Sequence, residues 1–195
     1  MLKKPKKAER TRAKIFAVAM NLFQKHGFDS ISVEQITTKA QVAKGTFFSH
    51  FPTKDAVLME IGEILFSYVT EKTIGKLPKS EKAKILLIFR VMAEWHYKNK
   101  QLSALITRLV LGTSNSYEPG NIGRKKALAV LTEIIRKGQE AGEFPNKTSP
   151  EIAAETLMGA YLFHLVEWHM QSSKKHFPRL IETSTKLILG GLCTS

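Results

Sequence analysis

The stretch from Ser32 to Leu58 constrains the fold more than any other part of this 195-residue chain. Ser32 is a favourable N-cap residue, and Gln35 follows at the spacing of a capping box, so a helix is predicted to begin at Val33. Apolar residues then recur at helical spacing as far as residue 40, after which residues 41–43 are expected to form a turn. A second short helix is predicted over residues 44–50.

The second short helix is expected to have two different faces. Phe47 and Phe51 lie four residues apart, so both can face inward together. Pro52 ends the helix, because the residue before a proline is biased away from the α region. The outer face and its edges then hold mainly small, polar and basic residues: Lys44, Gly45, Thr46, Phe48, Ser49 and His50. Two short helices with a tight turn and such an outer face are typical of a helix-turn-helix.

This stretch resembles the DNA-binding signature of TetR/AcrR-type transcriptional regulators. Gln41 occupies a turn position where that family usually has Gly, and a left-handed conformation costs Gln more than Gly. Phe48 stands where the family usually has Tyr, so the hydrogen bond from that hydroxyl to a phosphate should be absent. The matching residues are Gly27, Phe28, Ser32, Val33, Ile36, Ala40, Val42, Lys44, Gly45, Thr46, Phe47, His50, Phe51 and Lys54.

The resemblance implies that the second short helix enters the major groove of DNA. Phe48 then offers apolar contact with a thymine methyl or a sugar. Lys54 is expected to bind phosphate from a helix N-terminus, where backbone N–H groups also point outward. The candidates for contacts with base edges or adjacent phosphates are Lys44, Thr46 and Ser49, and the further candidates for phosphate contacts are His50 and Ser32.

Positive charge is concentrated in the same part of the chain. The formal net charge is +13, and residues 1–55 hold 11 Lys and Arg against 4 Asp and Glu. Such a patch suits a polyanion, either nucleic acid or an anionic membrane surface. The basic residues 3–7 are either a disordered, solubilising tail or an arm that contacts phosphates. Beside a helix-turn-helix we favour the arm, and we disfavour a peripheral membrane protein.

The composition, with 43% hydrophobic and 24% charged residues, is that of an ordinary soluble globular protein. No apolar run approaches the roughly 20 residues that span a bilayer, and no apolar segment of a secretory signal follows the N-terminal lysines. The single cysteine, Cys193, rules out an internal disulfide and fits a reduced, cytoplasmic setting.

Helical periodicity continues to the C-terminus without a convincing strand, so the sequence predicts an all-α fold. We expect residues 1–52 to form a helix-turn-helix DNA-binding domain and residues 53–195 a helical ligand-binding and dimerisation domain. Nine helices are predicted, over residues 9–26, 33–40, 44–50, 53–74, 80–98, 101–111, 124–141, 149–170 and 178–192.

The last two predicted helices resemble the pair through which TetR-family subunits form a four-helix bundle. Ala153, Ala154, Gly159 and Ala160 permit close helix approach. The alternative is that the apolar residues of these helices pack only within the subunit. The candidates for the interface are Leu157, Tyr161, Trp168 and Leu187.

The resemblance also implies a small-molecule effector site among the body helices. Each aromatic candidate has the alternative of being an ordinary core residue. Arg108 would suit an anionic effector, although a salt bridge or simple exposure explains it equally well. The candidate lining residues are Phe66, Met92, Trp95, His96, Tyr97, Arg108, Tyr117, Tyr161 and His164.

We find no sequence pattern that predicts catalysis. His164 and His169 lie about 140° apart on a helix, which makes them poor joint metal ligands, and no nucleophile elbow or phosphate loop is present. We expect neither a cofactor nor an enzyme. The sequence favours a homodimeric, ligand-responsive transcriptional repressor that binds a near-palindromic operator. The alternative is an architectural DNA-binding protein without an effector.

Overall fold

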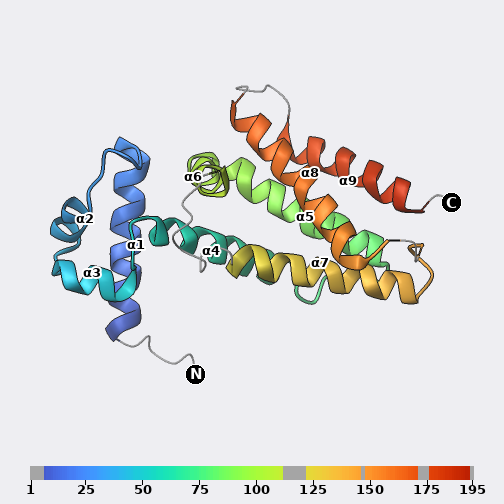
Figure 1. Ribbon diagram of the computed structural model, residues 1–195, viewed down its shortest axis with the longest axis horizontal. Coiled ribbons are helices and arrows are strands. Elements are labelled where there is room, and N and C mark those ends of the chain that lie inside the picture. The colour runs from blue at the N-terminus through green and yellow to red at the C-terminus, as the bar shows by residue number, and fades with distance from the viewer. Residues whose placement is uncertain (1–6, 112–121, 146–147, 171–175, 194–195) are drawn as a thin grey trace.

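The computed structural model describes residues 7–111, 122–145, 148–170 and 176–193. Throughout these residues the chain forms helices and no strand, which confirms the all-α prediction (Figure 1). Residues 1–6, Tyr117 and most of the loop predicted over residues 112–123 lie outside the described residues. The helices are α1 Lys7–His26, α2 Val33–Ala40, α3 Lys44–His50, α4 Asp55–Thr73, α5 Glu81–Lys98, α6 Lys100–Leu111, α7 Ile122–Glu140, α8 Pro150–Met170 and α9 Phe177–Cys193.

Local hydrogen bonds explain the helix-turn-helix. The Gln35 backbone N–H donates to the Ser32 hydroxyl at 3.2 Å, and the Ser32 N–H donates to the Gln35 side-chain oxygen at 2.8 Å. These two bonds complete the predicted capping box and begin α2. Gln41 adopts the left-handed conformation, with φ of 53°, and its N–H donates to the Thr38 carbonyl. The turn therefore forms with Gln at a position that favours Gly.

The N-terminal helices share one hydrophobic core, which we call the head core. Phe47 and Phe51 are fully buried in it, as the spacing predicts. The first part of α4 belongs to the same core through Val57, Leu58 and Ile61. The predicted domain boundary after residue 52 stays a prediction, and the packing makes α4 continuous with the head.

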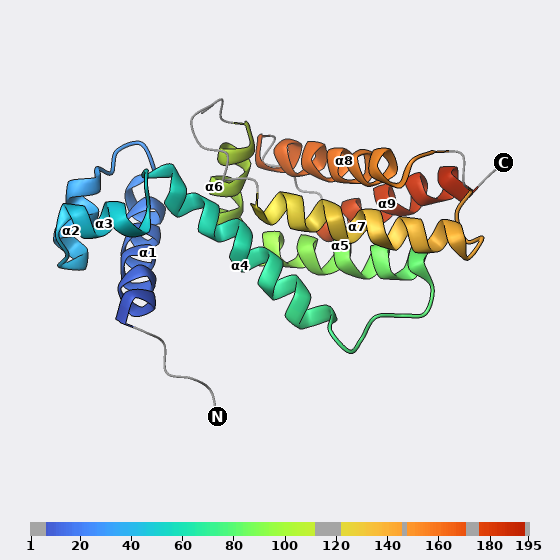
Figure 2. The ribbon, with the colours of Figure 1, turned by 60° about the horizontal axis from the view of Figure 1, so that its bottom comes forward.

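The remaining helices form a body around a second core. Helices α5, α7, α8 and α9 supply its buried residues, joined by Phe144 from the loop after α7, and α5 packs extensively along α9. Helix α4 leaves the head and runs obliquely across the body, while α6 lies between head and body (Figures 1 and 2). The N-terminal end of α7 meets α4 backbone to backbone, because a Cβ on Gly123 would come within 3.1 Å of Gly62. No helix in the described ranges is long and apolar enough to cross a membrane.

Candidate nucleic-acid interface and internal cavity

Helix α3 presents most of its predicted contact residues to solvent. Phe47 turns inward, and the ring of Phe48 packs edge-on against it with 5.4 Å between the centroids. Phe48 remains 42% exposed. The other exposed candidates are Lys44, Gly45 and Ser49, and Thr46 and His50 are half-buried. None of the predicted residues of α3 is fully buried, and Ser32 at the start of α2 is exposed as well. Their contacts with DNA stay a prediction.

Several of these side chains already have partners within the head. Lys44 forms an exposed ion pair with Glu34 of α2. The hydrogen bond from Lys44 holds the pKa of Glu34 below its ordinary value, with help from a backbone hydrogen bond. The Ser49 hydroxyl donates to the Thr46 carbonyl at 2.8 Å, which leaves its oxygen free to accept.

Lys54, which is expected to bind phosphate, also has partners within the head. Its Nζ donates to the carbonyl oxygens of Phe28 and Ile31, both at 3.0 Å. It also lies 4.2 Å from the centroid of the Phe28 ring. Two of its three N–H groups are thus used inside the head, because the loop after α1 leaves these carbonyls without helical partners. The hydroxyl of Thr53 caps the start of α4 by accepting from the Ala56 N–H at 3.1 Å.

Two ion pairs connect the helices around the junction of head and body. Arg108 of α6 donates to Asp29, in the loop after α1, at 2.5 Å, and its guanidinium lies 5.4 Å from the Phe28 ring centroid. Arg12 of α1 pairs with Glu60 of α4. Arg108 is therefore explained by a salt bridge to the head.

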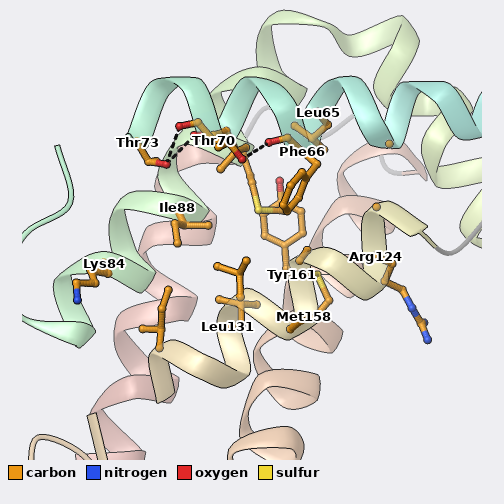
Figure 3. A pocket seen from close by; sticks show the side chains of 18 of the residues that line it. Leu65, Phe66, Thr70, Thr73, Lys84, Ile88, Arg124, Leu131, Met158 and Tyr161 are labelled. Atoms are coloured by element: carbon orange, nitrogen blue, oxygen red, sulfur yellow. Dashed lines mark hydrogen bonds between the residues drawn. The ribbon is translucent and has the colours of Figure 1, made fainter. Parts of the chain in front are cut away.

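A cavity of about 730 Å³ lies within the body, between α4, α5, α7 and α8. Its walls are mainly apolar, and the charged residues among them include both acids and bases, namely Glu63, Glu81, Lys84, Arg124, Glu133 and Lys137. In Figure 3, Lys84 of α5 and Arg124 of α7 appear on opposite sides of the view, with Leu131 and Tyr161 between them. This volume lies within the range of about 300–1,000 Å³ that holds small-molecule ligands.

The structure places four of the predicted lining residues around this cavity: Phe66, Met92, His96 and Tyr161. The other candidates, apart from Tyr117, which lies outside the described residues, lie elsewhere. Trp95 is buried in the head core, and Tyr97 packs beside Trp168 and His176. His164 hydrogen-bonds Ser184 of α9 at 2.9 Å, and Arg108 binds Asp29. Sequence reasoning missed ordinary residues such as Thr70, Ile88, Leu131, Met158 and Leu165, which carry no local signal of a cavity.

A buried polar chain adjoins the cavity. The Ser103 hydroxyl lies 2.7 Å from His96 Nδ1 and 2.7 Å from His169 Nε2. Burial, with the nearby His169, lowers the pKa of His96 to about 3. Burial, with the positive charge of Lys100, also lowers the pKa of His169. Both imidazoles are therefore neutral at pH 7. Burial raises the pKa of the Tyr161 hydroxyl well above its ordinary value.

The predicted interface residues divide into two groups. Leu157, Tyr161 and Trp168 are at most 5% exposed and belong to the body core, so within one subunit they face inward. Leu187 is 77% exposed on α9. Helices α8 and α9 lie side by side and expose further large apolar residues, namely Ile152, Phe163 and Met170. Helix α8 is apolar on both faces, so its sequence does not distinguish residues that face the core from residues that are exposed.

Comparisons with known proteins identify the class of this chain. Residues 15–61 match the family described as bacterial regulatory proteins, tetR family, and residues 60–191 match the YsiA-like protein C-terminal region. The chain therefore belongs to the TetR family of transcriptional regulators. Among the described residues, no group of three His, Cys, Asp or Glu side chains could hold a metal ion.

Particular relatives narrow the comparison. The Fatty acid metabolism regulator protein of Bacillus subtilis is 23% identical over 91% of this chain and 93% of its own. Thermus thermophilus FadR, a TetR-family repressor solved in complex with lauroyl-CoA, is 25% identical, with a TM-score of 0.80 over 94% of this chain and 96% of its own. The uncharacterized regulator YvdT of Bacillus subtilis is 31% identical, but the match spans only 40% of each chain.

Proposed function

We propose that this protein is a repressor that binds a palindromic operator as a homodimer and leaves it when a fatty acyl-CoA occupies the cavity. The observation that carries the proposal is the position of α4. Its first part packs in the head core through Val57 and Leu58, and later residues, including Phe66 and Thr70, line the cavity. A ligand in the cavity therefore touches the helix that carries the DNA-reading head.

The DNA contacts follow from the exposed side of α3. Lys44, Thr46 and Ser49 would reach base edges or adjacent phosphates, and Phe48 a thymine methyl or a sugar. Gly45 has open space where a Cβ would lie, so its lack of a side chain is not required by packing inside the protein. It instead permits close approach of the helix to DNA. Ser32 and His50 would bind phosphate, as would the remaining N–H of Lys54.

The coupling requires that the ligand bind two conformations of the protein with different affinity. Helix α6 offers a second connection besides α4, since Ile106 lines the cavity and Arg108 holds Asp29 in the head. A ligand that separates α4, α6 and α7 would therefore change the position of the head. In a dimer, this alters the spacing of two recognition helices and lowers the affinity for an operator of fixed spacing.

The ligand class is inferred from the lining of the cavity. The apolar interior suits a hydrocarbon chain. Of the bases that line the cavity, Lys84 and Lys137 are ion-paired with Glu81 and Glu133, so Arg124 is the base that would meet an anionic group of the ligand. The complex of Thermus thermophilus FadR with lauroyl-CoA supports an acyl thioester. The relative from Bacillus subtilis that is described as a fatty acid metabolism regulator supports the same class.

The dimer is supported by the uncovered apolar surface of α8 and α9. Ile152, Gly159 and Phe163 lie seven and four residues apart along α8, so they share one face. Phe163 is 63% exposed and Leu187, on the adjacent helix, is 77% exposed. A second copy that covers this face would form a four-helix bundle. Two-fold symmetry then predicts an operator of two inverted half-sites about one helical turn, or a multiple of it, apart.

The experiment selects the operator from a random DNA pool and measures binding by fluorescence anisotropy, with lauroyl-CoA added in steps. We expect release of the operator by lauroyl-CoA but not by coenzyme A alone. Ala127→Leu narrows the cavity from α7 and should retain DNA binding while it reduces the response. Operator binding that ignores bound lauroyl-CoA would contradict the proposed control. Equal affinity for every duplex would favour the architectural alternative.

A further inference from the structure

Unpartnered polar groups single out the cavity. Across the described residues, three buried side-chain oxygens have no hydrogen-bond partner, namely Glu63 Oε1, Glu81 Oε2 and the Tyr161 hydroxyl. All three residues line this cavity. Buried polar atoms are nearly always hydrogen-bonded in native proteins, so their concentration around one space requires an explanation.

Tyr161 differs from the two glutamates. Glu63 binds Lys126 at 2.6 Å and Glu81 binds Lys84 at 2.5 Å through their other oxygens. Each carboxylate therefore has a partner in the protein. The Tyr161 hydroxyl has no such partner, although the residue is only 2% exposed.

The surroundings of Tyr161 fix the direction of its hydroxyl. Its ring packs edge-on against Phe89, with 5.4 Å between centroids, and against Phe177 at 5.9 Å. The hydroxyl then points away from the core toward α4, beside Phe66 (Figure 3). Because burial raises its pKa, the phenol stays protonated and offers an O–H donor. Its neighbour His96 uses Nδ1 for Ser103.

We propose that the Tyr161 hydroxyl donates a hydrogen bond to the thioester carbonyl oxygen of the bound acyl-CoA. This rests on the proposed function. Phe66, beside the hydroxyl in Figure 3, and other lining residues such as Met92 and Leu165 are apolar and suit the acyl half of the ligand. On that half the thioester carbonyl is the acceptor. The bond fixes how deeply the acyl chain enters, and it selects thioesters over chains that lack the carbonyl.

The test compares two ligands of equal chain length, lauroyl-CoA and S-dodecyl-CoA, a thioether in which a CH₂ replaces the carbonyl. Isothermal titration calorimetry should show that the full-length protein binds lauroyl-CoA about tenfold more tightly. Tyr161→Phe removes only the hydroxyl, so it should bind both ligands equally and at the affinity of the thioether. Tyr97→Phe, which changes a tyrosine outside the cavity, should retain the tenfold preference.

The thermal stability of Tyr161→Phe without ligand provides a second test. Tyr161→Phe should raise the Tm of the unliganded protein by about 2–4 °C, because it removes a buried group that lacks a partner. If Tyr161→Phe keeps the preference, weakens both ligands equally or lowers the Tm, the assignment of the hydroxyl is wrong while the acyl-CoA response stands. If neither ligand binds the unmodified protein, both the assignment of the hydroxyl and the proposed response to acyl-CoA are wrong.

Discussion

The ammonium group of Lys54 lies 4.2 Å from the ring centroid of Phe28 and donates a hydrogen bond to the Phe28 carbonyl oxygen at 3.0 Å. A second bond reaches the carbonyl of Ile31. Lys54 thereby ties the first turn of α4 to the loop that connects α1 and α2. Since α4 also lines the cavity, this tie connects a cavity-lining helix to the helix-turn-helix head.

Lys54→Ala should therefore destabilise the protein even without DNA. It removes a charged donor from two carbonyl oxygens, of which that of Phe28 keeps the Ile31 N–H, and such a loss typically costs about 1.5–3 kcal/mol. Urea unfolding measures this loss, and Lys39→Ala, at an exposed site on α2, is the control. An unchanged free energy of unfolding, together with a salt slope of DNA binding lower by about one unit, would instead assign Lys54 purely to phosphate.

Phe48→Tyr should strengthen DNA binding. Phe48 is 42% exposed, so an added hydroxyl meets solvent in the free protein and can reach a phosphate in the complex. One net hydrogen bond contributes about 1 kcal/mol, or roughly fivefold in affinity. The consensus sequence should not change, because a phosphate contact reads no base. Anisotropy on operator and scrambled duplexes measures both quantities, and a gain confined to one sequence would refute the phosphate contact.

Glu34→Gln should also strengthen DNA binding, by about two- to fivefold at low salt. Glu34 holds Lys44 in an exposed ion pair, and this pair must compete with any contact of Lys44 to DNA. The change frees one cation and should steepen the salt dependence. Glu140→Gln, at the far end of α7, should alter neither quantity. Weaker binding by Glu34→Gln would mean that the pair orients Lys44 productively.

Local rules predicted the head well and the body less well. The capping box joins Ser32 and Gln35, which are three residues apart, so it can be predicted from the sequence. Lys54 and Arg108 find partners 26 and 79 positions away, which no local pattern encodes. Both faces of α8 are apolar, so the sequence does not distinguish the face that packs inside the subunit from the face that is exposed. Leu157 and Trp168, predicted at the interface, are buried inside the subunit.

Leu187→Glu should dissociate the dimer without unfolding the subunit. The side chain is 77% exposed in one subunit, so the new carboxylate meets water there. In the proposed bundle the substitution would replace one buried leucine in each subunit, and burial of each leucine stabilises the dimer by about 1.5–3 kcal/mol. The dissociation constant should rise at least about a hundredfold. Sedimentation velocity measures it, with Ile74→Glu, at an exposed site next to α4, as the control. Leu157→Glu is unsuitable because that residue lies in the core.

The pH dependence of the free energy of unfolding should reveal the lowered pKa of His96. Its pKa is about 3 in the folded protein, because of burial and the nearby His169, against about 6.5 when unfolded. Between these values the unfolded state binds more protons, so the free energy of unfolding falls as the pH drops below 6.5. From pH 6.5 to 5 this site alone should remove about 2 kcal/mol. His96→Gln keeps a polar side chain for Ser103 but does not titrate, and should flatten the dependence by that amount.

The measurement is urea unfolding at a single protein concentration and several pH values, with the wild-type curve compared to each variant. His26→Gln, at an exposed site at the end of α1, is the matched comparison for a His-to-Gln change outside the body core. If His96→Gln retains the full acid sensitivity, then His96 accepts a proton within the folded body. The neutral chain from His96 through Ser103 to His169 would then be wrong, because one of its imidazoles would be charged at mildly acidic pH.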